Sequence, residues 1–183
     1  MSLETLRQAV VATLDAATPK QVTCAAHGGR FDLNELKRVS AKAPALFVAV
    51  LGFGDLKESH GEYEAVVSWA AFVVTRDAPR VHRDKAAVAL VDALALIVPD
   101  NTWGTDACLN TPQNVRGDNL FNSTVDKAGV AMWAVSWRQS MRFAQAMTEE
   151  ALASLDLFEI FDAKYPVADD APVAEDNVTL PQD

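Results

Sequence analysis

The spacing of apolar and polar residues predicts an alternation of helices and strands along most of the chain. Three segments carry helical periodicity or a capping side chain at their start, namely 3–16, 32–40 and 83–98. Four segments are rich in apolar and β-branched residues, namely 45–53, 63–75, 113–121 and 129–143. This order predicts an α+β domain with a mostly antiparallel sheet of about four to five strands and helices packed on one face of it.

Two of the predicted strands carry a tryptophan near their centre. In the segment 129–143, the alternation of side chains places Trp133 and Trp137 on a face that can only be core. The opposite face begins with apolar residues and ends with Arg138 and Arg142, so it becomes polar and cationic along its length. We therefore expect the end of this strand to face water or a partner protein.

The strand at 63–75 and the helix at 83–98 have more apolar surface than one packed layer requires. The strand places Trp69 on one face and Phe72 on the other, and both faces are mostly apolar. The helix is apolar nearly all round, so it needs cover from a sheet on one side and from another helix or a neighbouring subunit on the other. Both features predict that other copies of the chain cover part of this surface.

Two connecting segments are expected to be irregular. The stretch GDLKESHGE at 54–62 is polar and contains two glycines, which predicts a hairpin loop. The stretch 101–127 is rich in turn residues, apart from the strand predicted at 113–121.

Charge is distributed unevenly along this chain of net charge −9. Residues 1–145 contain fifteen acidic and fifteen basic side chains, whereas residues 146–183 contain ten acidic side chains and one lysine. The chain is therefore expected to consist of a neutral body at 1–145 and an acidic C-terminal arm at 146–183. A body without net positive charge does not favour sequence-specific binding of nucleic acid, which needs a basic face.

The acidic arm also contains large apolar residues. Thr148, followed by two glutamates, indicates a short helix, and LDLFEIFDAKYP alternates apolar with acidic side chains. The stretch after Pro166, DDAPVAEDNVTLPQD, has the composition of a disordered segment. We expect the arm to be partly disordered and to dock on a neighbouring subunit. The candidate contacts in the arm are Leu157, Phe158, Ile160 and Phe161.

A cluster of charges follows the strand at 63–75. Arg76, Arg80 and Arg83 alternate there with acidic residues. The cluster could be an anion site, a subunit contact, or a solvated turn with local ion pairs, and the solvated turn is the simplest interpretation. Together with Arg138 and Arg142, these arginines are candidate residues of a subunit interface.

Residues that could carry catalysis or hold a metal are sparse. Cys24 and His27 have the spacing of half a zinc site, but the sequence has no second close pair of ligands. The glycines form no phosphate-binding motif, and no nucleophile elbow accompanies the turn at His27-Gly28-Gly29. We expect no catalytic residue, no cofactor and no metal, and therefore no enzymatic activity.

Two further features bear on location. The longest apolar run, 86–98, is interrupted by Asp92 and is shorter than the ~20 residues of a membrane-spanning helix. Two cysteines are too few for a disulfide framework, which favours a reducing compartment. We expect a protein that makes no contact with a membrane.

Four longer phrases carry a resemblance to a known family. They are LKRVSAKAPALFVAVLG at 36–52, WAAFVVTRDA at 69–78, RDKAAVALVDALALIVPDNTWG at 83–104 and VRGDNLFNSTVDKAGVAMWAVSWRQ at 115–139. In order and spacing, these phrases resemble the neck-region protein of Mu-like bacteriophages and prophages, which we assign to the tail terminators. The resemblance covers residues 1–143 and leaves out the acidic arm.

This resemblance implies a structural protein of the virion with a tail-terminator-like fold. Tail terminators form a hexameric ring that caps the tail tube and presents a surface to the head–tail connector protein. The resemblance therefore implies a homo-oligomer whose partners are the tail tube protein and the connector, with DNA passing through the ring lumen. Such a ring is assembled in the bacterial host cytoplasm and ends in the tail or neck of the virion.

Two alternative functions remain open at this point. The protein could be a portal-side connector or adaptor of the same neck, which would form a twelve-fold ring. It could also belong to a different class, a small-molecule-binding or enzymatic α+β domain with an unrecognised pocket. A stable monomer that binds a small ligand would favour this last class.

Overall fold

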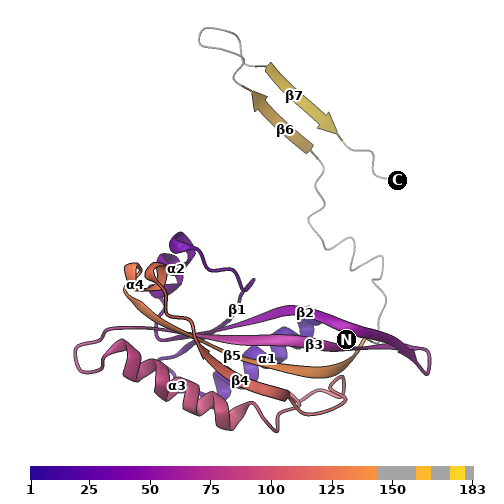
Figure 1. Cartoon of the computed structure of the whole chain (residues 1–183). Coiled ribbons are helices and arrows are strands. Elements are labelled where there is room, and N and C mark those ends of the chain that lie inside the picture. Colours follow the sequence, from indigo (N-terminus) through magenta and orange to yellow (C-terminus); the bar gives the residue numbers. More distant parts are fainter. Residues whose placement is uncertain (144–159, 166–173, 180–183) are drawn as a thin grey trace. The chain divides into compact units, whose positions relative to one another are not determined.

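The computed structural model describes residues 1–143, 160–165 and 174–179 of the chain. The chain divides into two compact units, Met1–Ala144 and Gln145–Asp183. The first unit, hereafter the body, has a five-stranded sheet of order β1-β2-β3-β5-β4 (Figure 1). All pairs of neighbouring strands are antiparallel except β1 and β2, so the predicted α+β class with a mostly antiparallel sheet is confirmed. The elements of the body are α1 Leu3–Ala17, β1 Thr23–Ala26, α2 Leu33–Ser40, β2 Ala45–Ser59, β3 Glu62–Arg76, α3 Arg83–Ile97, β4 Gln113–Asn119, α4 Ser123–Lys127 and β5 Val130–Phe143.

Side-chain caps set the starts of the first two helices, as their sequences predict. The Ser2 hydroxyl accepts a hydrogen bond from the Thr5 amide at 3.1 Å and begins α1. The Asp32 carboxylate accepts one from the Glu35 amide at 2.8 Å and begins α2. Each cap satisfies an amide that has no partner within the helix, which stabilises a helix by about 1 kcal/mol.

The segment predicted as a hairpin loop at 54–62 is mostly strand, so that prediction is wrong. Strand β2 continues to Ser59 and β3 begins at Glu62, leaving a two-residue turn of His60 and Gly61. Both turn residues have positive φ, 53° and 80°, as a type I′ turn between antiparallel strands requires. The polar residues of this stretch mark exposed strand rather than a loop, because the sheet is solvated at this end.

The sheet is buried on both faces near its centre. One face packs Val67, Trp69 and Trp137 into the larger core, and the other packs Phe72 and Met132 into a second core. Trp69 and Trp137 are almost fully buried and stack with their ring centroids 6.2 Å apart. Trp133 packs against the larger core, as predicted, but it is only partly buried and lies at the edge of that core. It faces the edge strand β4, where Asn119 is its neighbour and the cover is incomplete.

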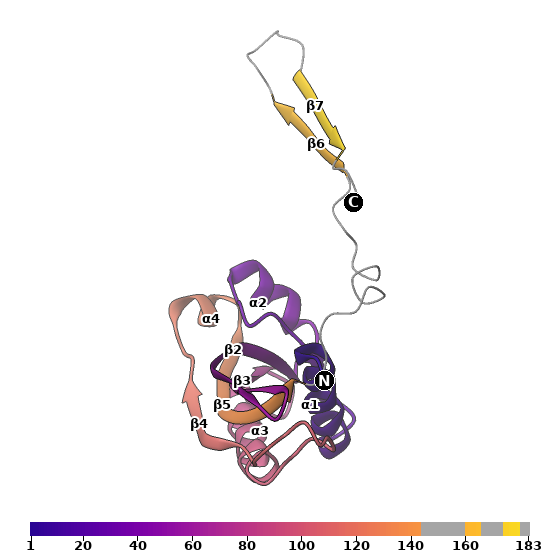
Figure 2. The same cartoon turned by 90° about the vertical axis from the view of Figure 1, so that its right-hand side faces the viewer.

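Helices cover both faces of the sheet, which corrects the expectation that they lie on one. The larger core contains buried side chains of α1 and α3, and the second core contains side chains of α2 and α4. Two views show α2 and α4 side by side on one side of the sheet and α1 and α3 on the other (Figures 1 and 2). Helix α4 was not predicted. Its five residues are too few to show a periodicity, and its clearest signal is Asn122, whose side chain caps it.

Helix α3 packs against the sheet along one side only. Ala87 and Leu94 are buried there, whereas Val88 is 45% exposed and Leu96 87% exposed on the outer side. Asp92 is exposed, as expected of an acid at a helix edge. Within the described residues nothing covers the outer apolar side, so its cover by a neighbouring subunit stays a prediction.

The second unit contains one described hairpin. Strand β6, Ile160–Tyr165, pairs antiparallel with β7, Ala174–Thr179. Residues 174–179 were expected to be disordered from their composition, and they form a strand instead. The alternating apolar and acidic positions at 160–165 have the two-residue period of a strand. The helix predicted from Thr148 lies outside the described residues.

Candidate assembly surfaces

The arginines at the turn between β3 and α3 form a network of local interactions. Arg83 donates its backbone amide to the Asp77 carboxylate at 2.9 Å, and its guanidinium lies 2.8 Å from the Asp126 carboxylate in α4. Its carbonyl accepts a hydrogen bond of 2.7 Å from the hydroxyl of Thr75, which is buried. Arg76 and Arg80 are exposed and form no ion pair with another described residue. The ion-pair interpretation therefore holds for Arg83, while Arg76 and Arg80 are free for a partner.

The five candidate arginines do not form one cluster. Arg76 is opposite Val130 at one end of the sheet, and Arg142 is opposite Glu64 near the other end, twelve residues away along β3. At about 3.3 Å per residue this is a separation of roughly 40 Å. Arg142 lies 3.0 Å from the Glu62 carboxylate. Arg138 is exposed and lies on β5 between these two ends of the sheet. The five arginines therefore do not form one compact patch, and their role in an interface stays a prediction.

The candidate contacts in the acidic arm are only partly described. Leu157 and Phe158 lie outside the described residues. Ile160 and Phe161 are the first two residues of β6, opposite Thr179 and Val178 of β7. Their part in docking stays a prediction.

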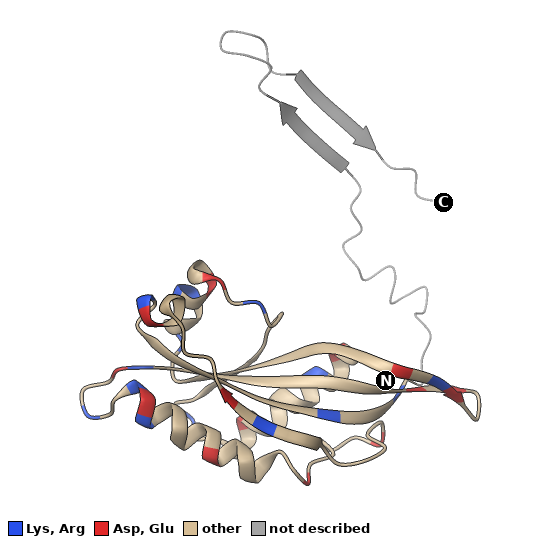
Figure 3. Ribbon diagram, in the orientation of Figure 1, with Lys and Arg blue, Asp and Glu red and all other residues tan. Residues whose placement is uncertain are grey.

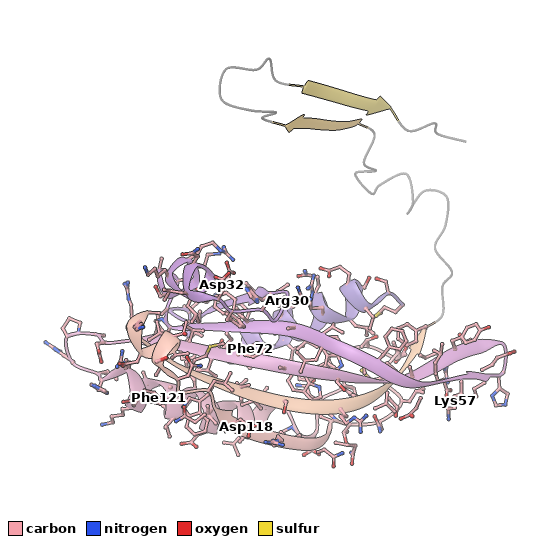
Figure 4. The ribbon with its side chains drawn as sticks, turned by 45° about the horizontal axis from the view of Figure 1, so that its top comes forward. Arg30, Asp32, Lys57, Phe72, Asp118 and Phe121 are labelled. Atoms are coloured by element: carbon pink, nitrogen blue, oxygen red, sulfur yellow. The ribbon has the colours of Figure 1, made fainter. Side chains whose placement is uncertain are left out.

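A groove that the sequence did not predict lies between α2 and α4. It has a cavity volume of about 790 Å³, and Phe72 and Met132 of the sheet lie at its floor. Phe31 and Phe121 line its walls, and Phe121 is 71% exposed (Figure 4). No spacing could reveal it, because the loop before α2, strand β3 and the loop before α4 are far apart in sequence.

Local backbone features hold the walls of this groove in place. The loop that carries Phe31 turns at Gly29, which has a φ of +78° and lies so close to β2 that an added Cβ would be 3.2 Å from the Ala49 Cβ. On the other wall, the Asn122 side chain accepts hydrogen bonds from the Thr124 and Val125 amides at 2.9 and 3.0 Å. The exposed Phe121 immediately precedes this cap. The groove is thus a defined feature of the fold.

The tip of the β2–β3 ribbon, residues 53–64, is a second exposed surface. Phe53, Leu56 and Tyr63 are each more than half exposed there. The same stretch contains four acidic side chains and one lysine. Large apolar side chains gathered at an exposed end of a sheet indicate an interaction site.

His27 lies beside a carboxylate, as a catalytic histidine often does, but both of its ring nitrogens already have hydrogen-bond partners. Nε2 lies 2.6 Å from the Glu35 carboxylate, and Nδ1 accepts a hydrogen bond of 2.9 Å from the Gly29 amide. The ring stacks on Phe31 with centroids 4.2 Å apart. An imidazole held on both nitrogens and stacked on a phenyl ring supports the loop and has no free lone pair to act as a base.

Hydrogen bonds and burial shift the pKa values of three ionisable groups in directions that do not favour catalysis. Hydrogen bonds from Arg38, and then from His27, lower the pKa of Glu35 to about 2. Burial raises the pKa of Cys108 to about 11 and also raises that of Cys24. Thiols with raised pKa values are poor nucleophiles at neutral pH. Among the described residues, no cluster of three metal-ligating side chains occurs.

The described helices include none with the length and apolar character to cross a membrane.

Comparison with known protein families shows which family the body matches. The model of a family described as "Bacteriophage Mu, Gp37" matches residues 2–143, which is nearly the whole body. No curated protein matches the chain.

Proposed function

Because the chain belongs to the bacteriophage Mu Gp37 family, we propose that it is the tail terminator of a Mu-like phage, a ring that caps the tail tube and joins it to the head connector. Membership of this family supports a structural protein of the virion. The finer assignment rests on the resemblance of the body to tail terminators and on the surfaces described above.

The observation that carries this proposal is the uncovered apolar surface of the body. Three separate apolar surfaces are exposed. They are the outer side of α3 with Val88 and Leu96, the side chain of Phe121, and the ribbon tip. A monomeric protein rarely keeps several such surfaces uncovered, whereas a subunit of a ring needs one contact on each side and further contacts along the ring axis. The engaged His27 and the raised thiol pKa values favour an assembly role over catalysis.

The ring is proposed to contain six copies. It contacts the tail tube protein on one face and the head–tail connector protein on the other, and DNA passes through its lumen. The body has no excess of basic residues, so DNA would pass without sequence-specific contact. The protein needs neither a cofactor nor a membrane for this role.

The acidic arm is proposed to dock on a neighbouring subunit or on the adjacent ring. Its ten acidic side chains are concentrated in residues 146–183, together with the apolar side chains that a docking segment uses. Electrostatic complementarity with exposed arginines such as Arg76 and Arg80 would guide that contact.

Controlled growth of tail tubes tests this function directly. Purified tube protein is allowed to polymerise with and without the full-length chain, at a few chains per tube. We expect shorter tubes, each with the chain at one end only, because a terminator stops addition of tube subunits. Unchanged tube length, or the chain bound along the whole tube, would exclude a terminator. Binding to the portal with no effect on tubes would instead indicate the portal-side adaptor.

A further inference from the structure

The groove between α2 and α4 and the ribbon tip lie at opposite ends of the same long strands. Phe72, at the groove floor, is opposite Phe47 near the start of β2, whereas the turn at His60 and Gly61 joins β2 and β3 at the other end. A strand of fifteen residues spans on the order of 45–50 Å. Two views place α2 and α4 at one end and the ribbon at the other (Figures 1 and 4).

The two ends carry opposite charge. Asp32 is the one charged residue that lines the groove itself, while the segments beside the groove, residues 30–42 and 76–85, contain eight basic and four acidic side chains. Ion pairs neutralise Arg38 and Arg83, and the other six basic residues form no ion pair with a described residue. In Figure 3 the ribbon is coloured for basic residues on α2 and on the turn before α3. This end of the body is therefore net cationic.

The ribbon tip is net acidic. Lys57 is paired with Glu64 at 3.3 Å, and Arg142 of β5 lies against Glu62. Asp55 and Glu58 are exposed and form no ion pair with a described residue. Two unpaired acidic side chains thus share the tip with the exposed Phe53, Leu56 and Tyr63, so the tip combines acidic and apolar surface.

We propose that the ribbon tip of one copy of this chain inserts into the α2–α4 groove of the next copy. This inference rests on the proposed ring and identifies its subunit contact. The apolar side chains of the tip would cover Phe31, Phe72 and Phe121, while Asp55 and Glu58 would approach basic residues beside the groove such as Arg30. Apolar contact supplies the affinity, and the opposite charges set the orientation.

The shape of the two surfaces favours this occupant. Apart from a bulge at Asp55 and Leu56, the tip is a paired, hydrogen-bonded hairpin, so it loses little conformational freedom on binding. Its three large side chains fit a groove of about 790 Å³. The contact joins different surfaces of two identical subunits, and a head-to-tail contact of this kind generates a ring when its rotation closes.

Complementation between two full-length variants tests the contact. The tip variant carries Leu56→Ser and Glu58→Lys, and the groove variant carries Phe121→Ser and Arg30→Glu. All four side chains are exposed, so both variants are expected to fold. Asp15→Lys, on the exposed surface of α1, serves as the control for a charge reversal. Sedimentation velocity measures the oligomeric state of each variant alone and of the mixture.

We expect the wild type and the control to form rings and each contact variant alone to stay monomeric. The mixture should form a 1:1 dimer and nothing larger, because the intact groove of the tip variant accepts the intact tip of the groove variant. If the wild type forms open chains and the mixture still forms the dimer, the result supports the contact between tip and groove and refutes the closed ring.

Other results overturn the contact. Rings formed by both variants would exclude it without affecting the ring itself. If the groove variant loses rings while the tip variant still forms them, another segment, such as the acidic arm, occupies the groove. A wild type that stays monomeric with and without tube protein would overturn both the contact and the ring.

Discussion

At the residue scale, one buried polar side chain organises a large part of the core. Gln139 is 1% exposed, and its amide oxygen accepts a hydrogen bond of 2.7 Å from the indole of Trp103. Its amide nitrogen donates to the carbonyls of Asn101 and Asn110 at 3.2 and 2.8 Å. Gln139 thereby holds the irregular segment between α3 and β4 against the sheet, and every polar atom of its side chain is satisfied.

Replacing Trp137 by alanine is predicted to destabilise the body by about 3–5 kcal/mol. Trp137 is 1% exposed and packs between Trp69 and Trp103, so its removal leaves a large cavity. Its indole nitrogen has no hydrogen-bond partner among the described residues, so the loss is one of packing. Chemical denaturation measures the change in unfolding free energy.

Two other substitutions calibrate this measurement. Trp133→Ala should cost less because Trp133 is only partly buried, and Phe121→Ala should change the stability of the monomeric body by no more than about 0.5 kcal/mol. A loss for Trp137→Ala no larger than that for Phe121→Ala would contradict the assigned core.

The carboxylate of Glu35 is predicted to make stability depend on acidic pH. Arg38 and His27 lower its pKa in the folded protein from its ordinary value near 4.5 to about 2. The folded state therefore holds this proton less tightly than the unfolded state. The stabilisation is fully present above about pH 4.5 and is lost as the pH falls from there toward 2.

Urea denaturation of the wild type and of Glu35→Gln, from pH 6 to pH 3, checks this dependence. The difference in unfolding free energy between the two should be constant above about pH 5 and shrink below it. Glu58→Gln removes an exposed acid without an ion pair and serves as the control. A difference for Glu35→Gln that is the same at all pH values would rule out this role of the ion pair.

At the element scale, the β2–β3 ribbon depends on its two-residue turn. Gly61 has a φ of +80° with no atom near the position of an added Cβ, so the constraint there is the backbone conformation and not space. Gly61→Ala is predicted to destabilise the body by about 1–2 kcal/mol, the cost of a left-handed conformation for a residue with a side chain. Thermal or chemical denaturation measures it.

A second glycine gives the matched control. Gly28 also has no atom within 4 Å of an added Cβ, and its φ is outside the left-handed range. Gly28→Ala should therefore leave stability within about 0.5 kcal/mol. Equal effects of the two substitutions would mean that the turn is not the type I′ turn described here.

The elements also show which features a sequence can predict. Helix α1 was predicted because Ser2 and the spacing of Leu6, Val10 and Leu14 are local signals. The ribbon was not, because its exposed polar residues have the composition of a loop, and their pairing across the turn, as of Lys57 with Glu64, does not show in composition. Local composition similarly missed the pairing of residues 174–179 with β6.

The candidate surfaces were predictable to a smaller degree. The arginines and the apolar helix α3 are visible in the sequence, although their separation along the sheet is not. The groove depends on Phe31, Phe72 and Phe121, which come together only in the folded chain. Helices on both faces of the sheet, rather than one, create the space between α2 and α4.

At the scale of the whole molecule, the acidic arm is predicted to be needed for assembly. A chain that ends at Ala146 retains the body, Met1–Ala144, and loses the segment that carries the net charge of −9. Docking of the arm predicts that this chain folds but fails in one of two steps, ring formation or joining of tails to heads. Assays of the two steps, done separately with circular dichroism as a check of folding, distinguish these outcomes. Normal yields of infectious particles from the truncated chain would show that the arm has no such role.

The central claim is that full-length chains form the six-fold ring that terminates a tail tube. Electron microscopy of the purified protein, alone and with tube protein, tests it through the symmetry of the class averages. The account predicts closed rings of six copies of the 19.8 kDa chain, free or at one end of each tube. Rings with twelve-fold symmetry, or a protein that stays monomeric at high concentration under both conditions, would contradict it.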